Sequence, residues 1–328
     1  MDRLEELHGR WEASYAPAGK VECPPWAEDI SCFHMHEGMQ KEQQQRMQEE
    51  YEQVYKPHAC ELHAWDANGF DRCVANRRII LIGDSLMRQM FQSLACLLGP
   101  VTASEHASNW SDISSTSAVN YPMPGYVGKY VSKQFWGDLK LVSGASVHAR
   151  IFGSFSSVLL EDLLTELGPL TERDVIITNF GAWYPRFVKQ DGEVVISSTY
   201  QRFERDMADL MRVLRQTPAQ ILWRSYAPTH FGGESGAYVS GEDYQEGCKP
   251  AALGEVWYDK WLADYLSSCG AKCDRVHMLP IFQLSLNKHQ SHLGSMSKAT
   301  VGSQSDCRHW CSNVLHAWNQ VLYNKLCF

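Results

Sequence analysis

The stretch RRIILIGDSLMRQMFQSLACLL, Arg77 to Leu98, changes from one apolar pattern to another at a serine. Four consecutive apolar residues, Ile79–Ile82, predict a short strand buried on both faces. After Ser85 the apolar residues recur at helical spacing, which predicts a helix that begins at the serine. A helix N-terminus carries free backbone N–H groups. Ser85 is therefore either a turn or capping residue, or a nucleophile whose developing negative charge those groups stabilise.

Strands and helices go on alternating along the rest of the chain. Further buried strands are predicted at 174–180, 220–226 and 275–281. Helical periodicity predicts helices at 158–167, 199–216, 256–268 and 314–326. The alternation predicts a three-layer α/β fold, a parallel sheet with helices on both faces. Ligands bind at the carboxyl ends of the strands in such sheets, and that edge should hold Ser85, Asn179 and Ser225.

The N-terminal part of the chain lacks the alternation of strands and helices. Residues 1–76 are irregular and carry several cysteines, and we expect them to pack on a catalytic domain formed by 77–328. Within this part, the segment Met39–Pro57 predicts an exposed helix that ends at its proline. Two long polar loops, 101–138 and 229–250, are long enough to shape a substrate cleft over the sheet.

Composition excludes several classes of protein. The chain has 328 residues, of which 44% are hydrophobic, and its net charge of −8 comes without a long Lys/Arg run. Binding to nucleic acid through a broad basic surface is therefore not expected. No apolar run approaches the roughly 20 residues of a membrane span. The first residues, MDRLEELHGRWEASY, lack the apolar core of a signal peptide, so any targeting segment is expected outside this sequence.

The chain has eleven cysteines, and their spacing indicates the kind of cellular compartment in which the protein folds. None forms a CxxC pair or a zinc-finger spacing, so we expect no structural metal. Dispersed cysteines at this density favour disulfides and an oxidising compartment, and the alternative is buried thiols in a cytosolic enzyme. A glycosylation sequon at Asn109-Trp110-Ser111 supports the first reading. The expected location is the secretory pathway, in the Golgi lumen or outside the cell.

A second motif lies near the C-terminus, in SQSDCRHWCSN, Ser303 to Asn313. Asp306 and His309 are three residues apart, a spacing at which a carboxylate can hold the imidazole Nδ1–H and leave Nε2 free as a base. The alternative is that Asp306 caps the last helix. Combined with Gly-Asp-Ser after the first buried strand, the motif suggests a Ser–His–Asp triad assembled from the two ends of the chain.

This order of motifs resembles the SGNH or GDSL hydrolase superfamily. Within it, the chain is similar to the plant trichome-birefringence-like and PC-esterase group, over roughly residues 20–328. The resemblance is carried by CPPW, ACELHAWDANGF, IILIGDSLMRQMFQSLAC, ITNFGAWYP, WRSYAPTHFGG and DCRHWCSNVLHAWNQVLYNKL, in that order. Members of this group are mostly polysaccharide O-acetyltransferases, with related esterases.

The resemblance implies a role for each matching residue. Ser85 is the expected nucleophile, His309 its base and Asp306 the carboxylate that orients the base. The backbone of Ser85 and the side chain of Asn179 are expected in the oxyanion hole, the alternative for Asn179 being a turn residue. Arg88 matches an arginine expected to contact substrate, the alternative being an exposed helix cation.

Further aromatic and histidine residues are candidates to line the substrate cleft. Trp183 and Trp310 are the best candidates among the tryptophans to line the cleft, because they adjoin Asn179 and His309. His230 either lines the cleft or caps a turn, whereas His289 and His292 belong to a polar loop. The chain departs from the group's pattern in having Ala182 and Gln89 where histidine and asparagine are common, and in lacking an N-terminal membrane anchor.

The resemblance also implies disulfides and an activity. Cys23 is expected to pair with Cys60 and Cys32 with Cys96, while Cys307 and Cys311 pair with upstream cysteines and at least one thiol stays unpaired. The expected activity is transfer of acetyl groups to polysaccharide hydroxyls, with a glycan as partner, no bound cofactor and an acetyl donor as second substrate. The alternatives are a carbohydrate O-acetylesterase with the same triad and a glycan-binding module without activity.

Overall fold

The protein is described from a computed structural model of the chain. The structure describes residues 9–13, 23, 53–58, 60–103, 135–152, 155–184, 187–190, 193–196, 200–231, 239–240, 247–250, 257–293 and 306–328. Most of the two long loops predicted at 101–138 and 229–250 lies outside these residues.

A six-stranded sheet forms the centre of the molecule, in the order β11-β9-β6-β3-β5-β4. Its strands are β3 (Arg78–Gly83), β4 (Phe135–Lys140), β5 (Ser146–Ile151), β6 (Val175–Asn179), β9 (Gln220–Arg224) and β11 (Val276–Leu279). Neighbouring strands are parallel except at the edge, where β4 runs antiparallel to β5. The expected all-parallel sheet is therefore corrected at β4, which reaches β5 through a short turn and needs no crossover helix.

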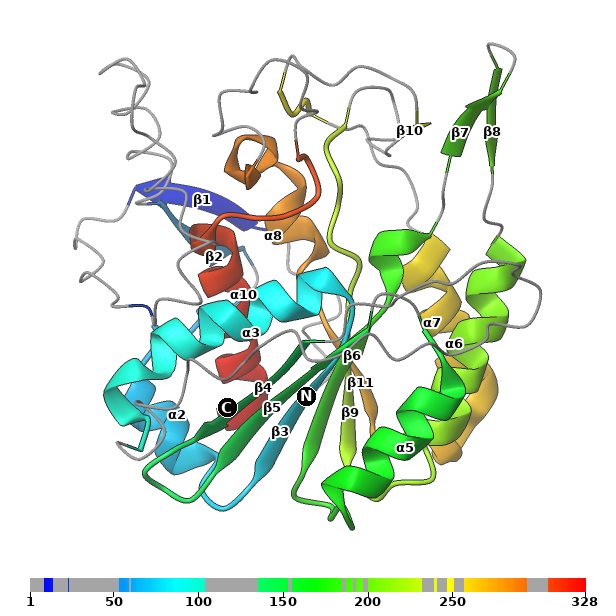
Figure 1. Cartoon of the computed structure of the whole chain (residues 1–328). Helices are drawn as coiled ribbons and strands as arrows, with labels where there is room; N and C mark the ends of the chain where they lie inside the picture. The colour runs from blue at the N-terminus through cyan, green and yellow to red at the C-terminus, as the bar shows by residue number, and fades with distance from the viewer. Residues whose placement is uncertain are drawn as a thin grey trace.

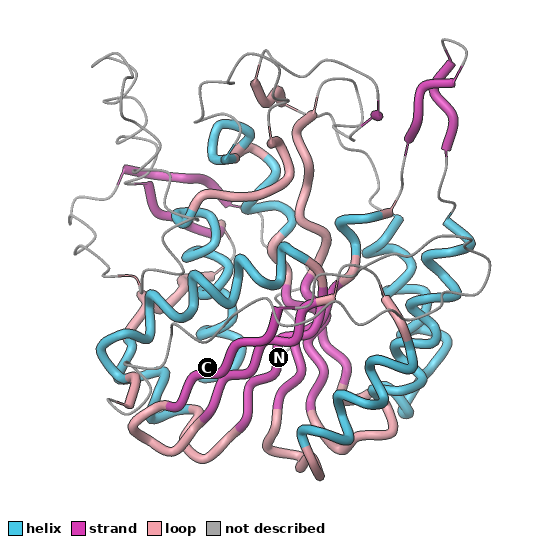
Figure 2. Tube along the Cα trace, viewed as in Figure 1, coloured by secondary structure: helices cyan, strands magenta, loops and turns pink. Residues whose placement is uncertain are grey.

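Helices cover both faces of this sheet, as Figures 1 and 2 show. One face carries α3 (Ser85–Leu98) and α10 (Ser312–Cys327), and the other carries α5 (Ser157–Leu167), α6 (Tyr200–Leu214) and α7 (Trp257–Cys269). Ile79–Ile82 are completely buried, and their side chains alternate between the two core layers. This confirms the three-layer α/β fold, because a strand covered on both faces needs a continuous apolar run.

The N-terminal part adds two short strands and a helix to one side of the fold. Strands β1 (Gly9–Ala13) and β2 (Gln53–Pro57) pair antiparallel, and α2 (Ala67–Cys73) follows. The helix predicted over Met39–Pro57 is therefore wrong at its end, since residues 53–57 pair with β1; residues 39–52 lie outside the described part. Trp11 fixes this hairpin by donating from Nε1 to the Leu284 carbonyl at 2.8 Å.

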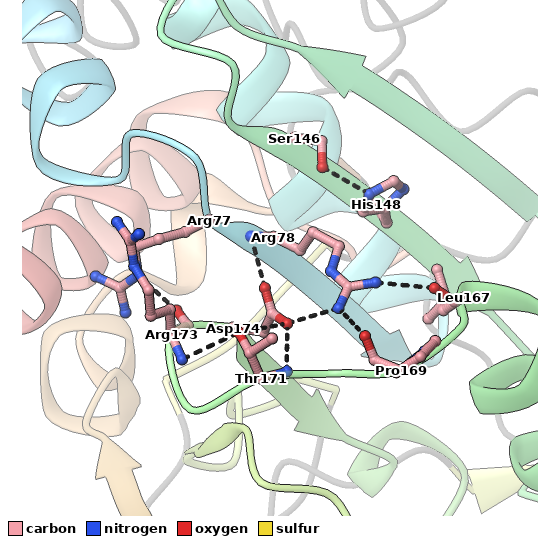
Figure 3. Close-up of polar contacts among 9 residues, drawn as sticks. All are labelled: Arg77, Arg78, Ser146, His148, Leu167, Pro169, Thr171, Arg173 and Asp174. Carbon is pink, nitrogen blue, oxygen red and sulfur yellow. Dashed lines mark hydrogen bonds and ion pairs between the residues drawn. The ribbon is translucent and has the colours of Figure 1, made fainter.

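At the amino ends of the strands, an arginine cluster closes the sheet (Figure 3). Arg78 pairs with the buried Asp174 at 2.7 Å and also donates to the carbonyls of Leu167 and Pro169. Burial alone would raise the pKa of Asp174, but the hydrogen bonds from Arg78 and Thr171 outweigh it and lower the pKa. The charged side chains at the amino ends of the strands are thus engaged in contacts that stabilise the fold.

The disulfides differ in part from those expected. Cys23 pairs with Cys96, so both predicted pairs, Cys23–Cys60 and Cys32–Cys96, are wrong. Cys96 is buried on α3, where Cys23 packs against the core, whereas Cys60 is an exposed free thiol. Cys32 lies outside the described residues.

The prediction for the cysteines around His309 is confirmed at Cys307, which pairs with the upstream Cys248. Cys311 is also disulfide-bonded. Two further disulfides join Cys73 to Cys327 and Cys269 to Cys273.

Candidate active site

The serine stands where β3 gives way to α3, as the sequence predicted. Gly83 ends the strand, and a Cβ there would collide with the Asn179 carbonyl and the Met87 side chain, so only glycine fits. Asp84 caps the helix by accepting from the Leu86 backbone N–H at 3.0 Å. Ser85 follows as the first helical residue and is partly exposed. Asp84 is therefore the capping residue, which removes the simple capping role for Ser85.

Ser85 meets the C-terminal motif in space. Its Oγ lies 2.8 Å from His309 Nε2, and His309 Nδ1 lies 2.7 Å from Asp306 Oδ2. Since a carboxylate only accepts, Nδ1 carries the imidazole proton and Nε2 accepts from the Ser85 hydroxyl. The order of partners, Ser–His–Asp, is that of a hydrolytic triad.

Asp306 is held in place by its own turn. Its Oδ1 accepts from the backbone N–H groups of Arg308, at 3.1 Å, and His309, at 3.0 Å. Burial alone would raise the pKa of Asp306, but the hydrogen bonds from His309 and these backbone groups lower it to about 2. The last helix, α10, has Cys311 as its N-cap, so Asp306 does not cap it.

Asn179 ends β6 directly beside Gly83 in the sheet register. Its Oδ1 accepts from the Gly181 N–H and its Nδ2 donates to the Arg224 carbonyl, both at 2.7 Å. Asn179 is therefore a turn residue, and the amide still has a second hydrogen that these contacts do not use. Its part in an oxyanion hole stays a prediction.

Two of the expected cleft residues belong to the core instead. Trp310 and His230 have no exposed surface, so the prediction that they line a cleft is corrected. The backbone of Trp310 is held at both its N–H and its carbonyl by the Gln89 side chain, at 3.0 and 3.1 Å. Arg88 is partly exposed in the first turn of α3, and Trp183 follows Asn179 in a 3₁₀ turn; their substrate contacts stay predictions.

A buried histidine pair supports the loop that carries His309. His230 Nδ1 lies 2.6 Å from His292 Nε2, and His292 Nδ1 donates to the His309 carbonyl at 3.1 Å. Burial lowers the pKa of His230 to about 4 and that of His292 well below its usual value. His292 is thus fully buried, against the expectation of a polar loop.

A second Ser–His–Asp contact lies on strands β4 and β5. Ser146 Oγ is 2.8 Å from His148 Nε2, and His148 Nδ1 is 2.6 Å from Asp138 Oδ1 (the first contact is drawn in Figure 3). The Ser146 N–H, however, donates to the Arg77 carbonyl within the sheet. Because the Ser146 N–H is already hydrogen-bonded, it cannot stabilise an oxyanion as the N–H of a nucleophilic serine does. Variants of this second contact can therefore serve as controls for variants of the Ser85–His309–Asp306 contact.

The described residues were compared with the requirements of a metal site and of a membrane span. Within them, no group of three or more His, Cys, Asp or Glu side chains could hold a metal ion. None of the helices in that part of the chain is long and apolar enough to cross a bilayer.

A serine at a strand–helix joint, in contact with an Asp-oriented imidazole at the carboxyl edge of an α/β sheet, defines the class of SGNH-type acyl-transfer enzymes. The match to the family described as "PC-Esterase: GDSL/SGNH-like Acyl-Esterase family found in Pmr5 and Cas1p" covers residues 62–325. The chain belongs to this family.

Individual relatives are similar over most of their length. Protein trichome birefringence-like 41 of Arabidopsis thaliana is 24% identical over 341 residues, covering 97% of this chain and 89% of the relative. Xylan O-acetyltransferase 14 of Oryza sativa subsp. japonica is 22% identical, with 96% of this chain and 75% of the relative covered. Xyloglucan O-acetyltransferase 1 of Populus trichocarpa is 22% identical, covering 82% and 70%.

Proposed function

We propose that this protein transfers acetyl groups to polysaccharide hydroxyls through an acetyl-enzyme on Ser85. The observation that carries the proposal is the unbroken contact from Ser85 Oγ through His309 to Asp306. The substrate class is taken from similar proteins named xylan and xyloglucan O-acetyltransferases. The four disulfides among the described residues support an oxidising compartment, such as the secretory pathway.

In the first half of the reaction, Ser85 Oγ attacks the carbonyl carbon of the acetyl donor and its proton passes to His309 Nε2. The backbone N–H of Ser85 and the unused amide hydrogen of Asn179 stabilise the negative oxygen. The donor's leaving group then takes the proton from His309, and the acetyl group stays on Ser85.

In the second half, a sugar hydroxyl gives its proton to His309 and attacks the acetyl-enzyme, after which the proton returns to Ser85. An esterase would use water at this step with the same residues. Transfer exceeds hydrolysis only when the acceptor hydroxyl is held near His309 and water is excluded. The acceptor therefore decides between the two activities.

The test combines an artificial acetyl ester with xylan-type oligosaccharides and mass spectrometry of the products. We expect acetylated oligosaccharide from the native protein and none from Ser85→Ala. The matched control is Ser146→Ala, which removes the hydroxyl of the second Ser–His–Asp contact and should leave turnover unchanged. Acetate release that no glycan alters would favour the esterase, and normal turnover in Ser85→Ala would overturn the covalent mechanism.

A further inference from the structure

A side-chain amide on α3 binds the loop that carries His309. Gln89 comes one helical turn after Ser85, about 6 Å further along the helix axis and on the same face. Its Oε1 accepts from the Trp310 N–H at 3.0 Å, and its Nε2 donates to the Trp310 carbonyl at 3.1 Å. Both ends of one amide are therefore bound to the residue that directly follows His309.

The backbone of Trp310 has an open edge on the side of α3. Trp310 and His292 form an isolated antiparallel bridge, whose hydrogen bonds are made by their neighbours. The Leu293 N–H, for example, donates to the His309 carbonyl at 3.0 Å. In such a pair, the N–H and carbonyl of the bridged residue itself point away from the partner segment. The Gln89 amide binds these two groups as the backbone of a further strand would.

Gln89 is a polar side chain in an apolar part of α3. It is 4% exposed, and the next two residues, Met90 and Phe91, belong to the hydrophobic core. A buried amide is costly unless both of its ends are hydrogen-bonded. The orientation of this amide is fixed, because the Trp310 N–H can only donate and the Trp310 carbonyl can only accept. Packing alone would be satisfied by an apolar residue at this position, so the two bonds call for a further explanation.

Helix α3 and the loop are thus joined at two points, one turn apart. At the first point Ser85 Oγ lies 2.8 Å from His309 Nε2, and at the second the Gln89 amide binds Trp310. One hydrogen bond lets two elements rotate relative to each other, whereas two contacts a turn apart fix both their distance and their angle. His292 holds the loop from the other side, where its Nδ1 donates to the His309 carbonyl at 3.1 Å.

We propose that Gln89 is a positioning residue: its amide fixes the loop against α3 and so sets the distance between His309 Nε2 and Ser85 Oγ. The consequence for activity rests on the proposed function, whereas the attachment of the loop does not. Gln89 acts through Trp310, so its loss should affect the chemical step more than substrate binding. A misplacement of about 1 Å in a reacting group can cost about 100-fold in rate.

Turnover of a chromogenic acetyl ester by Gln89→Met tests the consequence for catalysis. Methionine has about the length of glutamine and fills the same space, but it makes neither bond to Trp310. We expect kcat to fall by about tenfold or more with little change in KM. Gln89→Asn keeps the amide on a side chain shorter by one methylene, so it should retain more of the native kcat than Gln89→Met. A native kcat in Gln89→Met would overturn the positioning role.

Asn319 on α10 offers the matched control, because it is also a fully buried amide that binds α3. Its Nδ2 donates to the Met90 carbonyl at 3.1 Å and to Ser93 Oγ at 2.9 Å. Asn319→Leu removes both bonds at nearly constant size. We expect Asn319→Leu and Gln89→Met each to lower Tm by roughly 5 °C, while Asn319→Leu keeps the native kcat. Equal losses of kcat in the two variants would mean that general loosening of α3 is the cause, and would overturn the inference.

Hydrogen exchange tests the attachment of the loop without any substrate. In Gln89→Met the Trp310 N–H loses its acceptor, so the peptide that spans 306–311 should exchange about fivefold faster or more, and Asn319→Leu should leave its rate native. Unchanged exchange in Gln89→Met would overturn the inference. If Gln89→Met does not fold, Gln89→Asn gives the same readouts with smaller changes. If the native protein turns over no acetyl ester, the proposed function fails instead, and exchange still decides whether Gln89 holds the loop.

Discussion

At the scale of single residues, Asp306 orients the imidazole of His309, which we propose as the base. Asp306 is ionised throughout the neutral range, because its pKa of about 2 lies below its usual value of 3.8. Its contact therefore stabilises the folded protein fully above pH 3.8, and this stabilisation is lost as the pH falls through about 2. Any loss of activity between neutral pH and pH 5 then reports on a group other than Asp306.

Asp306→Asn tests this assignment. Asparagine keeps the size of the side chain but removes the charge and favours the wrong tautomer of His309, so kcat should fall by as much as about 10⁴-fold. The control is Asp138→Asn, the same change in the second Ser–His–Asp contact, which should leave kcat unchanged. Turnover of a chromogenic acetyl ester measures both. Normal turnover in Asp306→Asn would reduce the site to Ser85 and His309.

The sequence indicated that Ser85, Asp306 and His309 meet, as they do in the structure, but not what surrounds them. Ser85, Asp306 and His309 carry motifs whose order along the chain is informative. Trp310 and His230 were assigned to the cleft because they neighbour site residues in sequence or motif, yet adjacency does not determine which way a side chain points. Ala182, which donates to Asp84, and Trp310, whose backbone contacts Gln89, lie far from them in sequence, so no local pattern indicated these contacts.

At the scale of elements, the apolar runs found β3, β6, β9 and β11, and helical periodicity found α5, α6, α7 and α10. Strand β4, with sequence FWGDLK, was missed because glycine and aspartate interrupt its apolar pattern. Its pairing with β5 is what makes it a strand, and tertiary pairing of this kind is not visible in a local window. The same holds for β2, whose partner β1 lies some forty residues upstream.

The loop before α10 carries His309, the proposed base, and the attachment of this loop can be tested. Cys307 is joined to Cys248, and its carbonyl accepts from the His230 N–H at 2.9 Å. Cys248→Ala/Cys307→Ala removes this covalent link and leaves the hydrogen bonds of the loop and the disulfide at Cys311. Asp306 should then be less well fixed, and kcat should fall by roughly tenfold. Steady-state kinetics at a temperature below the melting transition measures this.

The matched control for that experiment is Cys269→Ala/Cys273→Ala, which removes a disulfide at the end of α7 with a sequence separation of 4. That variant should keep the native kcat. Equal kcat values in the native protein and in Cys248→Ala/Cys307→Ala would mean that the remaining hydrogen bonds and the disulfide at Cys311 suffice to position His309.

At the scale of the whole molecule, segments from the two ends of the chain are joined covalently as well as by packing. Ser85 follows strand β3 and His309 precedes the last helix, so their contact exists only when the two ends of the fold meet. Helices α3 and α10 pack on one face and share the core that supports them. Cys73 and Cys327 fasten α2 to the end of α10 across a separation of 254 residues.

Removing this last disulfide should affect stability and spare catalysis. In the chain-entropy account, a closed segment of this length stabilises the fold by about 5.5 kcal/mol and the Cys269–Cys273 disulfide by about 2 kcal/mol. Cys73→Ala/Cys327→Ala should therefore lower Tm by roughly 10 °C or more, well beyond the loss in Cys269→Ala/Cys273→Ala. The 16 residues of α10, about 24 Å of helix, separate Cys327 from the catalytic loop, so kcat at 25 °C should stay native. A lower kcat without a lower Tm would contradict this division between stability and catalysis.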